Sequence, residues 1–215
     1  MSEHDHHQQT LSERYGQETW DARYSESDRI WSGNPNQRLV EQVTGLTPGT
    51  ALDVGAGEGA DSVWLARQGW QVTALDVSPV ALAKTAAHAA EAGVEVTTVQ
   101  HDLVSLAPLP GSYDLVSAQF WHPPLERFAD FRDVIGAAVR PGGTLLVVAH
   151  HPASLQGQPD THGHAAFLFD QDKVAALFDT DEWDVQVSAA QTRPTTRPDG
   201  PAEVTDSVFR AVRRA

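Results

Sequence analysis

The stretch LDVGAGEGAD, residues 52–61, decides the fold, because an apolar strand there runs directly into three closely spaced glycines. The pattern predicts a strand, a tight turn and a helix that begins directly behind the turn. Glycines let the backbone approach a ligand closely, and free N–H groups at the start of a helix favour polar or anionic atoms. Asp76 ends the next predicted strand, 21 residues after Gly55, where an acid accepts hydrogen bonds from ribose hydroxyls. The spacing therefore predicts an adenosine-containing ligand at the carboxyl end of a sheet.

The glycine turn does not by itself select that ligand. The run from Gly55 to Ala60 satisfies both GxGxG and the GxGxx(G/A) pattern of dinucleotide-binding proteins, and a tight turn without any ligand stays open. Asp53 lies two residues before Gly55, inside the strand, where an acid suits a cationic ligand better than a pyrophosphate. Asp102, near the end of the third predicted strand, is expected at the same edge of the sheet.

Strands and helices alternate along the middle of the chain. The predicted strands are 51–56, 71–77, 94–102, 113–121 and 144–151, and the predicted helices are 58–69, 79–91 and 124–139. Ser78 and Pro79 suit the N-cap and the first turn of the second helix. This alternation is typical of right-handed βαβ units, so the predicted fold class is α/β, a Rossmann-like doubly wound, mostly parallel sheet.

The two ends of the chain differ from this pattern. Residues 170–179 read as a capped helix, and two strands, 183–192 and 205–214, flank the turn-rich stretch RPTTRPDGPAE. Two consecutive strands without an intervening helix predict an antiparallel pair at the sheet edge. Residues 1–14 are polar and aperiodic and are expected to form a disordered tail. Residues 15–215 are expected to form one domain, with two short helices between residues 17 and 43.

The composition limits the partners and the chemistry. The 215 residues carry 29 acidic and 15 basic side chains, a formal net charge of −14, and no cysteine. Such a surface repels phosphate backbones, so a small-molecule substrate is expected and nucleic acid is not. The absence of cysteine excludes disulfides, thiolate catalysis and the common structural zinc sites. No segment reads as a membrane span or a secretory signal, so we expect a cytoplasmic protein without a membrane partner.

Together, the glycine turn, Asp53, Asp76, Asp102 in QHDL, YDLVSAQ and RPGGTLLVV resemble the class I S-adenosylmethionine-dependent methyltransferases. The resemblance extends from about Trp20 to the C-terminus and implies a seven-stranded sheet with an antiparallel last strand. It also implies S-adenosylmethionine as the cofactor. Residues 15–48 look like the helical lid of small methyltransferases of the thiopurine and tellurite type, on the strength of Trp20, Tyr24 and WSGNPNQRLV.

The resemblance implies roles for individual residues. The methionine part of the cofactor would lie along the glycine turn, with Asp53 holding the turn near the cofactor's amino group. Asp76 would bind the ribose, Asp102 would accept from the adenine amino group, and Ala118 would offer its backbone at the end of the fourth strand. The full set of expected cofactor-binding residues is Trp31, Asp53, Gly55, Ala56, Gly57, Gly59, Asp76, Val77, Asp102, Leu103 and Ala118. The alternatives are a strand end or helix cap for each acid, and simple packing for the lid aromatics.

The sequence FWHPPL, residues 120–125, follows the fourth strand, where the methyl acceptor is expected to bind. His122 is the candidate catalytic residue, because histidine suits removal of a proton from a hydroxyl or amine. The alternative is that His122 shapes the turn while Phe120 and Trp121 wall the pocket. Enzymes that methylate amino groups of nucleobases and amides often carry (D/N)PP(Y/F/W) here, and the different residue order argues against that class.

The predicted function is in-line transfer of a methyl group from S-adenosylmethionine to a small-molecule acceptor. A nicotinamide-dependent oxidoreductase stays an alternative, although the chain has no Tyr-x-x-x-Lys pair and only two lysines. A non-catalytic protein that binds the cofactor is the second alternative. Ten histidines invite a metal site, but no ligand spacing supports one, so no functional metal is expected.

Overall fold

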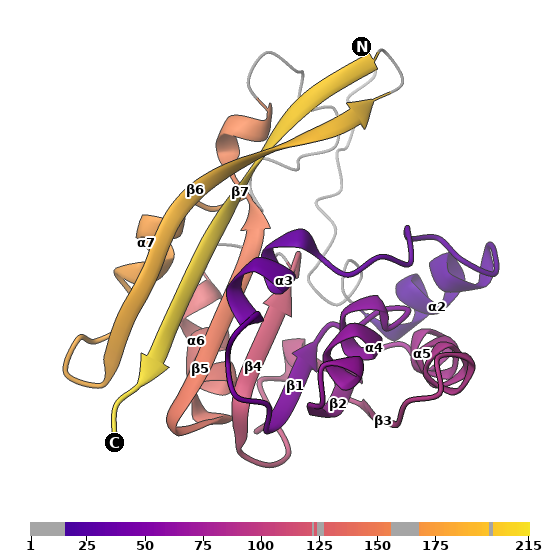
Figure 1. Cartoon of the computed structure of the whole chain (residues 1–215), viewed down its shortest axis with the longest axis horizontal. Helices are drawn as coiled ribbons and strands as arrows, with labels where there is room; N and C mark the ends of the chain where they lie inside the picture. The colour runs from indigo at the N-terminus through magenta and orange to yellow at the C-terminus, as the bar shows by residue number, and fades with distance from the viewer. Residues whose placement is uncertain (1–15, 122, 124–126, 156–167, 198–199) are drawn as a thin grey trace, which may run out of the picture.

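The computed structural model describes residues 16–121, 123, 127–155, 168–197 and 200–215. Its seven strands form one sheet in the order β3-β2-β1-β4-β5-β7-β6 (Figure 1). The strands are β1 (Thr50–Val54), β2 (Gln71–Asp76), β3 (Val96–Gln100), β4 (Tyr113–Gln119), β5 (Val139–His150), β6 (Trp183–Arg197) and β7 (Gly200–Arg213). Strands β1 to β5 pair in parallel, and β7 pairs antiparallel with both β5 and β6. The predicted α/β class and the antiparallel pair at the edge are confirmed.

Helices cover both faces of this sheet. They are α2 (Gln17–Ser25), α3 (Gln37–Val43), α4 (Ala60–Arg67), α5 (Pro79–Glu91), α6 (Phe128–Ala137) and α7 (Gln171–Ala175), with short 3₁₀ helices η1 (Leu103–Ser105) and η3 (Pro152–Leu155). The Ser78 side chain accepts a hydrogen bond from the Ala81 N–H, which confirms the predicted N-cap of α5. Both predicted helices between residues 17 and 43 are present.

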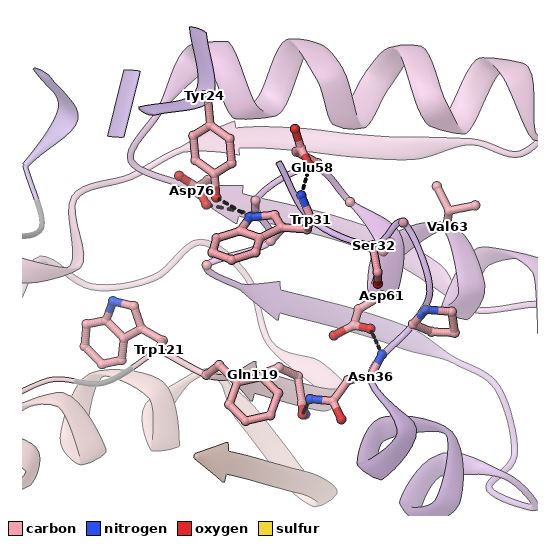
Figure 2. Close-up of a pocket in the computed structure, with 18 of the residues that line it drawn as sticks. Tyr24, Trp31, Ser32, Asn36, Glu58, Asp61, Val63, Asp76, Gln119 and Trp121 are labelled. Carbon is pink, nitrogen blue, oxygen red and sulfur yellow. Dashed lines mark hydrogen bonds between the residues drawn. The ribbon is translucent and has the colours of Figure 1, made fainter. Parts of the chain in front are cut away.

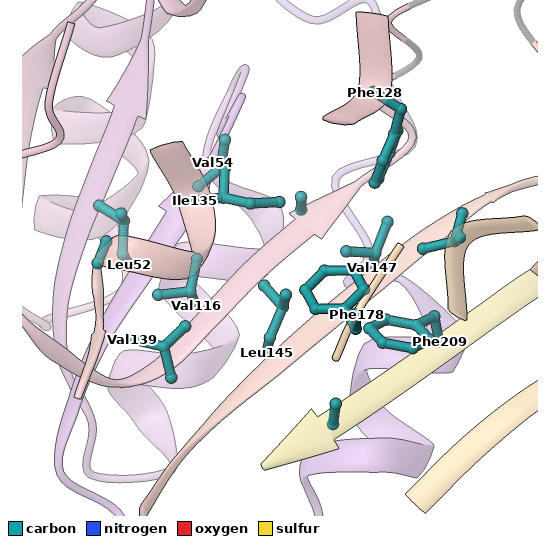
Figure 3. Close-up of a cluster of buried hydrophobic side chains, with 14 of the residues drawn as sticks. Leu52, Val54, Val116, Phe128, Ile135, Val139, Leu145, Val147, Phe178 and Phe209 are labelled. Atoms are coloured by element: carbon teal, nitrogen blue, oxygen red, sulfur yellow. The ribbon is translucent and has the colours of Figure 1, made fainter. Parts of the chain in front are cut away.

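Alternate residues of the central strands face opposite helical layers. Leu52, Val54, Leu145 and Val147 belong to a core cluster that packs against α6 and α7 (Figure 3). Their neighbours Ala51, Leu146 and Val148 belong to a second cluster with α3 and α4. Because both faces are covered, these strands are apolar at nearly every position, as is usual for parallel sheets. The glycine turn therefore extends from a rigid, fully buried strand.

The C-terminal hairpin is longer than the sequence pattern predicts. Strand β6 continues through Pro194, which lies opposite Glu203 of β7, so the stretch predicted as turn-rich is mostly strand. Proline is tolerated because β6 is the edge strand, whose outer N–H groups have no ladder partner to lose. Figure 1 shows this hairpin extending beyond the other strands.

The prediction for residues 124–139 is wrong at its C-terminal end. Helix α6 ends at Ala137, and Val139 begins β5 opposite Tyr113. Pro141 disfavours helical backbone at the preceding residue, so the chain turns into the strand earlier than the apolar spacing indicates. In the part of the chain that the structure describes, no helix has the length and apolar character needed to cross a membrane.

Candidate functional site

A cavity of about 1400 Å³ opens at the carboxyl ends of β1, β2 and β4. Its walls are the glycine turn (residues 55–59), the ends of these strands and the N-terminal segment 16–36, called the lid below. Figure 2 shows Tyr24 and Trp31 of the lid together with Asp76, Gln119 and Trp121 around this space. Nine of the predicted site residues line it, namely Trp31, Gly55, Ala56, Gly57, Gly59, Asp76, Val77, Asp102 and Leu103.

The glycine turn is held by the neighbouring strand. The N–H groups of Gly55 and Ala56 both donate to the carbonyl of Leu75, at 2.8 and 3.0 Å. Gly57 has a φ of +56°, and a Cβ there would lie 2.8 Å from the Tyr24 hydroxyl. The backbone geometry and the close approach of the lid therefore both require glycine at this position.

Asp76 ends β2 with its carboxylate almost fully buried at the cavity wall. One oxygen accepts from the Gly57 N–H and the other from the Ser78 N–H, each at 2.9 Å. Burial raises the pKa of this carboxyl, and the backbone N–H groups partly oppose that effect. An ionised carboxylate has about four lone-pair positions. The N–H groups of Gly57, Ser78 and Val77 use some of them, and the remaining capacity can accept from hydroxyl groups of a ligand.

Tyr24 and Trp31 bring two aromatic rings of the lid close to the glycine turn. The Trp31 indole N–H donates to the Tyr24 hydroxyl at 3.3 Å. Burial, with a smaller contribution from the Asp76 charge, raises the pKa of Tyr24 to about 12, so this phenol stays neutral. Aromatic faces beside the turn suit a cationic ligand group.

Glu58, inside the glycine turn, fastens the lid to the domain. Its carboxylate accepts from the N–H groups of Ile30 and Trp31 at 3.0–3.1 Å and pairs with Lys84 of α5 at 3.0 Å. Burial raises the pKa of Glu58, but the Trp31 N–H, Lys84 and the Ile30 N–H outweigh it and hold the pKa below its ordinary value. The Lys84 ammonium also donates to the Ser27 carbonyl, so both charges tie the lid to α5.

Glu58→Gln is expected to lower the free energy of unfolding by about 1–3 kcal/mol, because charge-assisted bonds are lost and the partly buried Lys84 loses its counter-charge. Urea unfolding measures this change, and trypsin cleavage after Arg23 and Arg29 should become faster as the lid loosens. The exposed Glu95→Gln variant is the control for charge removal. A Glu58→Gln protein with unchanged stability and cleavage would contradict the fastening role.

Asn36 joins the lid to two elements of the sheet domain. Its backbone N–H donates to Asp61 of α4 at 2.6 Å, and its side-chain amide donates to Gln119 of β4 at 2.9 Å (Figure 2). Gln119 in turn donates to the Ser117 hydroxyl. The end of the lid is thus fixed at the ends of α4 and β4, where the cavity opens.

Asp53 and Ala118 do not line the cavity. Asp53 faces α4, because it alternates with Leu52 and Val54 on the strand, and it accepts from the Ser62 hydroxyl at 2.6 Å. Burial, then the charge of Asp61, raises the pKa of Asp53 to about 7. Burial also raises the pKa of Asp61 to about 6, and Asp61 does line the cavity. The acid on the ligand side of this pair is therefore Asp61 rather than Asp53.

Asp102 and Leu103 follow β3 at the far end of the cavity from Gln119. The Asp102 carboxylate is exposed and caps η1 by accepting from the Val104 N–H at 2.8 Å. Leu103 is buried beside it, and Val77 follows Asp76 on the neighbouring strand. The hydrogen bond from Val104 uses one lone pair of the Asp102 carboxylate, so the other lone pairs can accept from a ligand.

The opposite wall follows β4. The Trp121 side chain packs against the glycine turn, since a Cβ on Gly55 would lie 3.6 Å from the indole. Phe120, His150 of β5, Leu168 and Arg193 of β6 continue this wall. The candidate His122 lies outside the described residues.

Several residues that line the cavity are not among the predicted site residues. For only some of them does the sequence contain a pattern that points to the site. Glu58 stands inside the glycine motif and Asp61 directly after it, but their contacts are with lid backbone, which side-chain patterns do not show. Arg193 lies in the stretch that the sequence predicts to be rich in turns. Among the described residues no group of three or more His, Asp or Glu side chains could hold a metal ion. His4, His6, His7, His162 and His164 lie outside those residues.

Comparison with known proteins identifies the domain. Residues 51–143 match the family model described as a methyltransferase domain. The ribosomal RNA small subunit methyltransferase C of Alcanivorax borkumensis is 38% identical over 48% of this chain and 33% of its own length. A ubiquinone biosynthesis O-methyltransferase of Pseudomonas paraeruginosa is 33% identical over 68% of this chain and 64% of its own. The chain thus spans between one third and two thirds of these relatives.

Solved structures share the fold over nearly the whole chain. One such structure is described by the conversion of a disulfide bond into a thioacetal group during echinomycin biosynthesis. It superposes with a TM-score of 0.74 at 21% identity and covers 92% of this chain and 91% of that one. The magnesium protoporphyrin IX methyltransferase of Synechocystis PCC 6803 with bound S-adenosylmethionine gives 0.60 at 19% identity, covering 97% and 86%. Residues 51–143 therefore match a methyltransferase domain, and the chain shares the fold of solved structures that include a methyltransferase.

Proposed function

We propose that this protein binds S-adenosylmethionine in the cavity and transfers its methyl group to a small-molecule acceptor. The observation that carries the proposal is Asp76, a buried carboxylate beside the glycine turn whose remaining lone-pair capacity suits the ribose hydroxyls. The methionine part would lie along the turn beneath Tyr24 and Trp31. The adenine would lie between Val77 and Leu103, with Asp102 at its edge.

The residues of this chain act mainly by placing the two reactants. Methyl transfer is an in-line displacement, so alignment of the acceptor atom with the carbon–sulfur bond supplies much of the acceleration. The side of the cavity that follows β4 is called the acceptor wall below, because the acceptor is expected to bind there. Trp121 packs against Gly55 and would set the distance between this wall and the cofactor. The lid, held by Glu58 and Asn36, would exclude water from the sulfonium.

A small-molecule acceptor is favoured over nucleic acid by the charge of −14, although one relative is named as a ribosomal RNA methyltransferase. The charge of this chain disfavours a phosphate backbone at any surface that is not locally basic. The same proposal includes a cytoplasmic location and one domain over residues 15–215.

A thermal-shift comparison of S-adenosylhomocysteine with oxidised nicotinamide adenine dinucleotide tests the cofactor. At about 100 times Kd a ligand stabilises the folded state by about 2.7 kcal/mol, which raises Tm by about 5–10 °C for a chain of this size. We expect that shift with S-adenosylhomocysteine only. A shift with the dinucleotide alone would contradict the proposed cofactor and favour the oxidoreductase alternative. Tight S-adenosylhomocysteine binding without turnover across thiol, phenol and amine acceptors would favour the non-catalytic alternative.

A further inference from the structure

The three C-terminal strands bring a cluster of charged and aromatic side chains to the acceptor wall. His150, the last residue of β5, lies directly opposite Asp206 of β7 in the antiparallel register. Arg193 of the neighbouring β6 reaches the same carboxylate. His150 is more than 40 positions from Arg193 and Asp206 in the chain, and only the strand register brings the three together.

Asp206 is the centre of this cluster. Its carboxylate is fully buried and accepts from Arg193 Nε at 2.7 Å and from Arg38 Nε at 3.2 Å. Burial alone raises the pKa of Asp206, but the side chains of His150, Arg193 and Arg38 reverse that effect and hold the pKa below its ordinary value. Asp206 is therefore a fixed negative charge whose position two guanidinium groups determine.

His150 lies between this charge and the cavity. Its Nδ1 is buried and lies 3.8 Å from an Asp206 oxygen, whereas 40% of the side chain is exposed at the cavity. A carboxylate beside Nδ1 favours the tautomer with the proton on that nitrogen. Nε2 then carries the lone pair, on the part of the ring directed away from Asp206. The 3.8 Å separation is longer than a hydrogen bond, so Asp206 acts on the His150 ring through its charge at this distance.

Phe120, whose ring packs on His150, has an unusual backbone conformation that a hydrogen bond holds in place. The Phe120 ring packs on the His150 ring with centroids 4.4 Å apart, and the Phe120 φ is +54°, in the left-handed region that bulky residues rarely adopt. The Phe120 N–H donates to the Val148 carbonyl at 2.8 Å, which fixes this conformation. Such strain is concentrated at functional sites. Here Phe120 contacts His150, while the next residue, Trp121, contacts the glycine turn, and both line the cavity.

We propose that His150, oriented by Asp206, is the general base for an acceptor with an aromatic hydroxyl group, bound between Phe120, Trp121 and Leu168. This inference rests on the proposed function, because it assigns the acceptor side of the same cavity. His150 would be a catalytic residue, and Asp206 a positioning residue that acts through it. Two aromatic rings and a leucine favour a flat apolar molecule over a sugar or a peptide.

The proposed step is balanced without a further reagent. As the hydroxyl oxygen attacks the methyl carbon, its proton passes to His150 Nε2, and the electron pair of the carbon–sulfur bond returns to sulfur. The products are the methyl ether, S-adenosylhomocysteine and an imidazolium, which returns its proton to solvent. Asp206 would stabilise the imidazolium, and the Arg193 charge would favour the developing phenolate.

A hydroxyl acceptor needs a base more than other acceptors do. A phenol with a pKa near that of tyrosine, about 10, is almost fully protonated at neutral pH. An aromatic thiol ionises without help under the same conditions, so it should need no base. A phenol and a thiol can have the same ring and nearly the same shape, and they then differ mainly in whether they need a base. Comparing their rates therefore separates a proton-transfer role of His150 from a packing role.

The test uses 4-methylphenol and 4-methylbenzenethiol with S-adenosylmethionine, with methylated product measured by mass spectrometry. His150→Gln is expected to lower kcat/KM for the phenol about 100-fold, the usual contribution of a general base, and to abolish the rise of the rate with pH. The charged groups that face His150 among the described residues are Asp206 and Arg193, with Arg38 behind them, so one ionisation should dominate the profile. The thiol should change less than about three-fold.

Controls separate the possible outcomes. His151→Gln changes the adjacent histidine, whose Nδ1 accepts from the Ala153 N–H, and should leave both rates unchanged. Asp206→Asn should lower the phenol rate and shift its pH profile, with binding of S-adenosylhomocysteine retained. Three results would each overturn the inference. The first is an equal loss of rate for phenol and thiol, and the second is a loss in His122→Gln in place of His150→Gln. The third is a wild-type protein that binds S-adenosylhomocysteine but methylates no phenol. Failure to bind S-adenosylhomocysteine would instead overturn the proposed function.

Discussion

Replacing Asp76 by alanine is expected to weaken the binding of S-adenosylhomocysteine at least about 100-fold, because the two proposed hydrogen bonds to the ribose are charge-assisted and each contributes about 1.5–3 kcal/mol. The substitution also releases the Gly57 N–H, which Asp76 now holds in position at the base of the turn. Titration calorimetry measures the loss. Far-ultraviolet circular dichroism checks that the sheet is intact.

Two matched variants make this prediction specific. Asp76→Asn keeps the shape and one acceptor oxygen, so its binding should fall between that of wild type and Asp76→Ala. Asp102→Ala removes the acid at the end of the next strand, which is exposed and caps η1, and should weaken binding far less, since water competes for its ligand contact. Affinity of Asp76→Ala within about three-fold of wild type would rule out the ribose assignment.

The sheet and the glycine turn could be predicted because their signals are local. A strand followed by Gly55, Gly57 and Gly59 leaves few conformations open, and Ser78 with Pro79 fixes the start of α5 by chemistry within one turn. The cavity-lining positions of Asp76 and Asp102 follow from the same rule, because the ends of parallel strands meet at one edge of the sheet.

The side chain of Asp53 shows where the inference from motifs stops. Ala51 and Asp53 share one face of β1, and alternation places that face against α4 rather than at the strand end. The motif associates this acid with the ligand, but the geometry gives the cavity position to Asp61 of the following helix. An argument from period-two alternation would have separated the two acids, whereas motif position alone could not.

The acceptor wall could not be predicted, because it depends on the register of the last two strands. Pro194 made residues 193–203 look like turns, although an edge strand accommodates proline. Only the observed pairing places Arg193, Asp206 and His150 together. The lid contacts through Glu58 and Asn36 were hidden for another reason, since they involve backbone N–H groups that no residue pattern encodes.

Asp53→Asn is expected to make the free energy of unfolding fall less as the pH rises from about 4 to about 7. Asp61 and Asp76, whose pKa values are also raised, contribute the rest of the fall. The pKa of Asp53 is about 7 in the folded protein, chiefly through burial, against an ordinary value of 3.8. The folded state therefore keeps a proton that the unfolded chain loses above about pH 4, and the free energy of unfolding decreases until the folded group also ionises. A shift of this size corresponds to about 4 kcal/mol.

Urea unfolding at a series of pH values measures how the free energy of unfolding changes with pH. This change is a better quantity than the absolute stability, because the new amide also alters the hydrogen bond to Ser62. Asp114→Asn is the control of opposite sign. The Thr50 N–H and other donors hold the pKa of Asp114 below its ordinary value, so its carboxylate stabilises the folded state at neutral pH and this contribution is lost on acidification. If the Asp53→Asn curve ran parallel to the wild-type curve, Asp53 would be ionised throughout, and the raised pKa values of Asp61 and Asp76 would account for the fall.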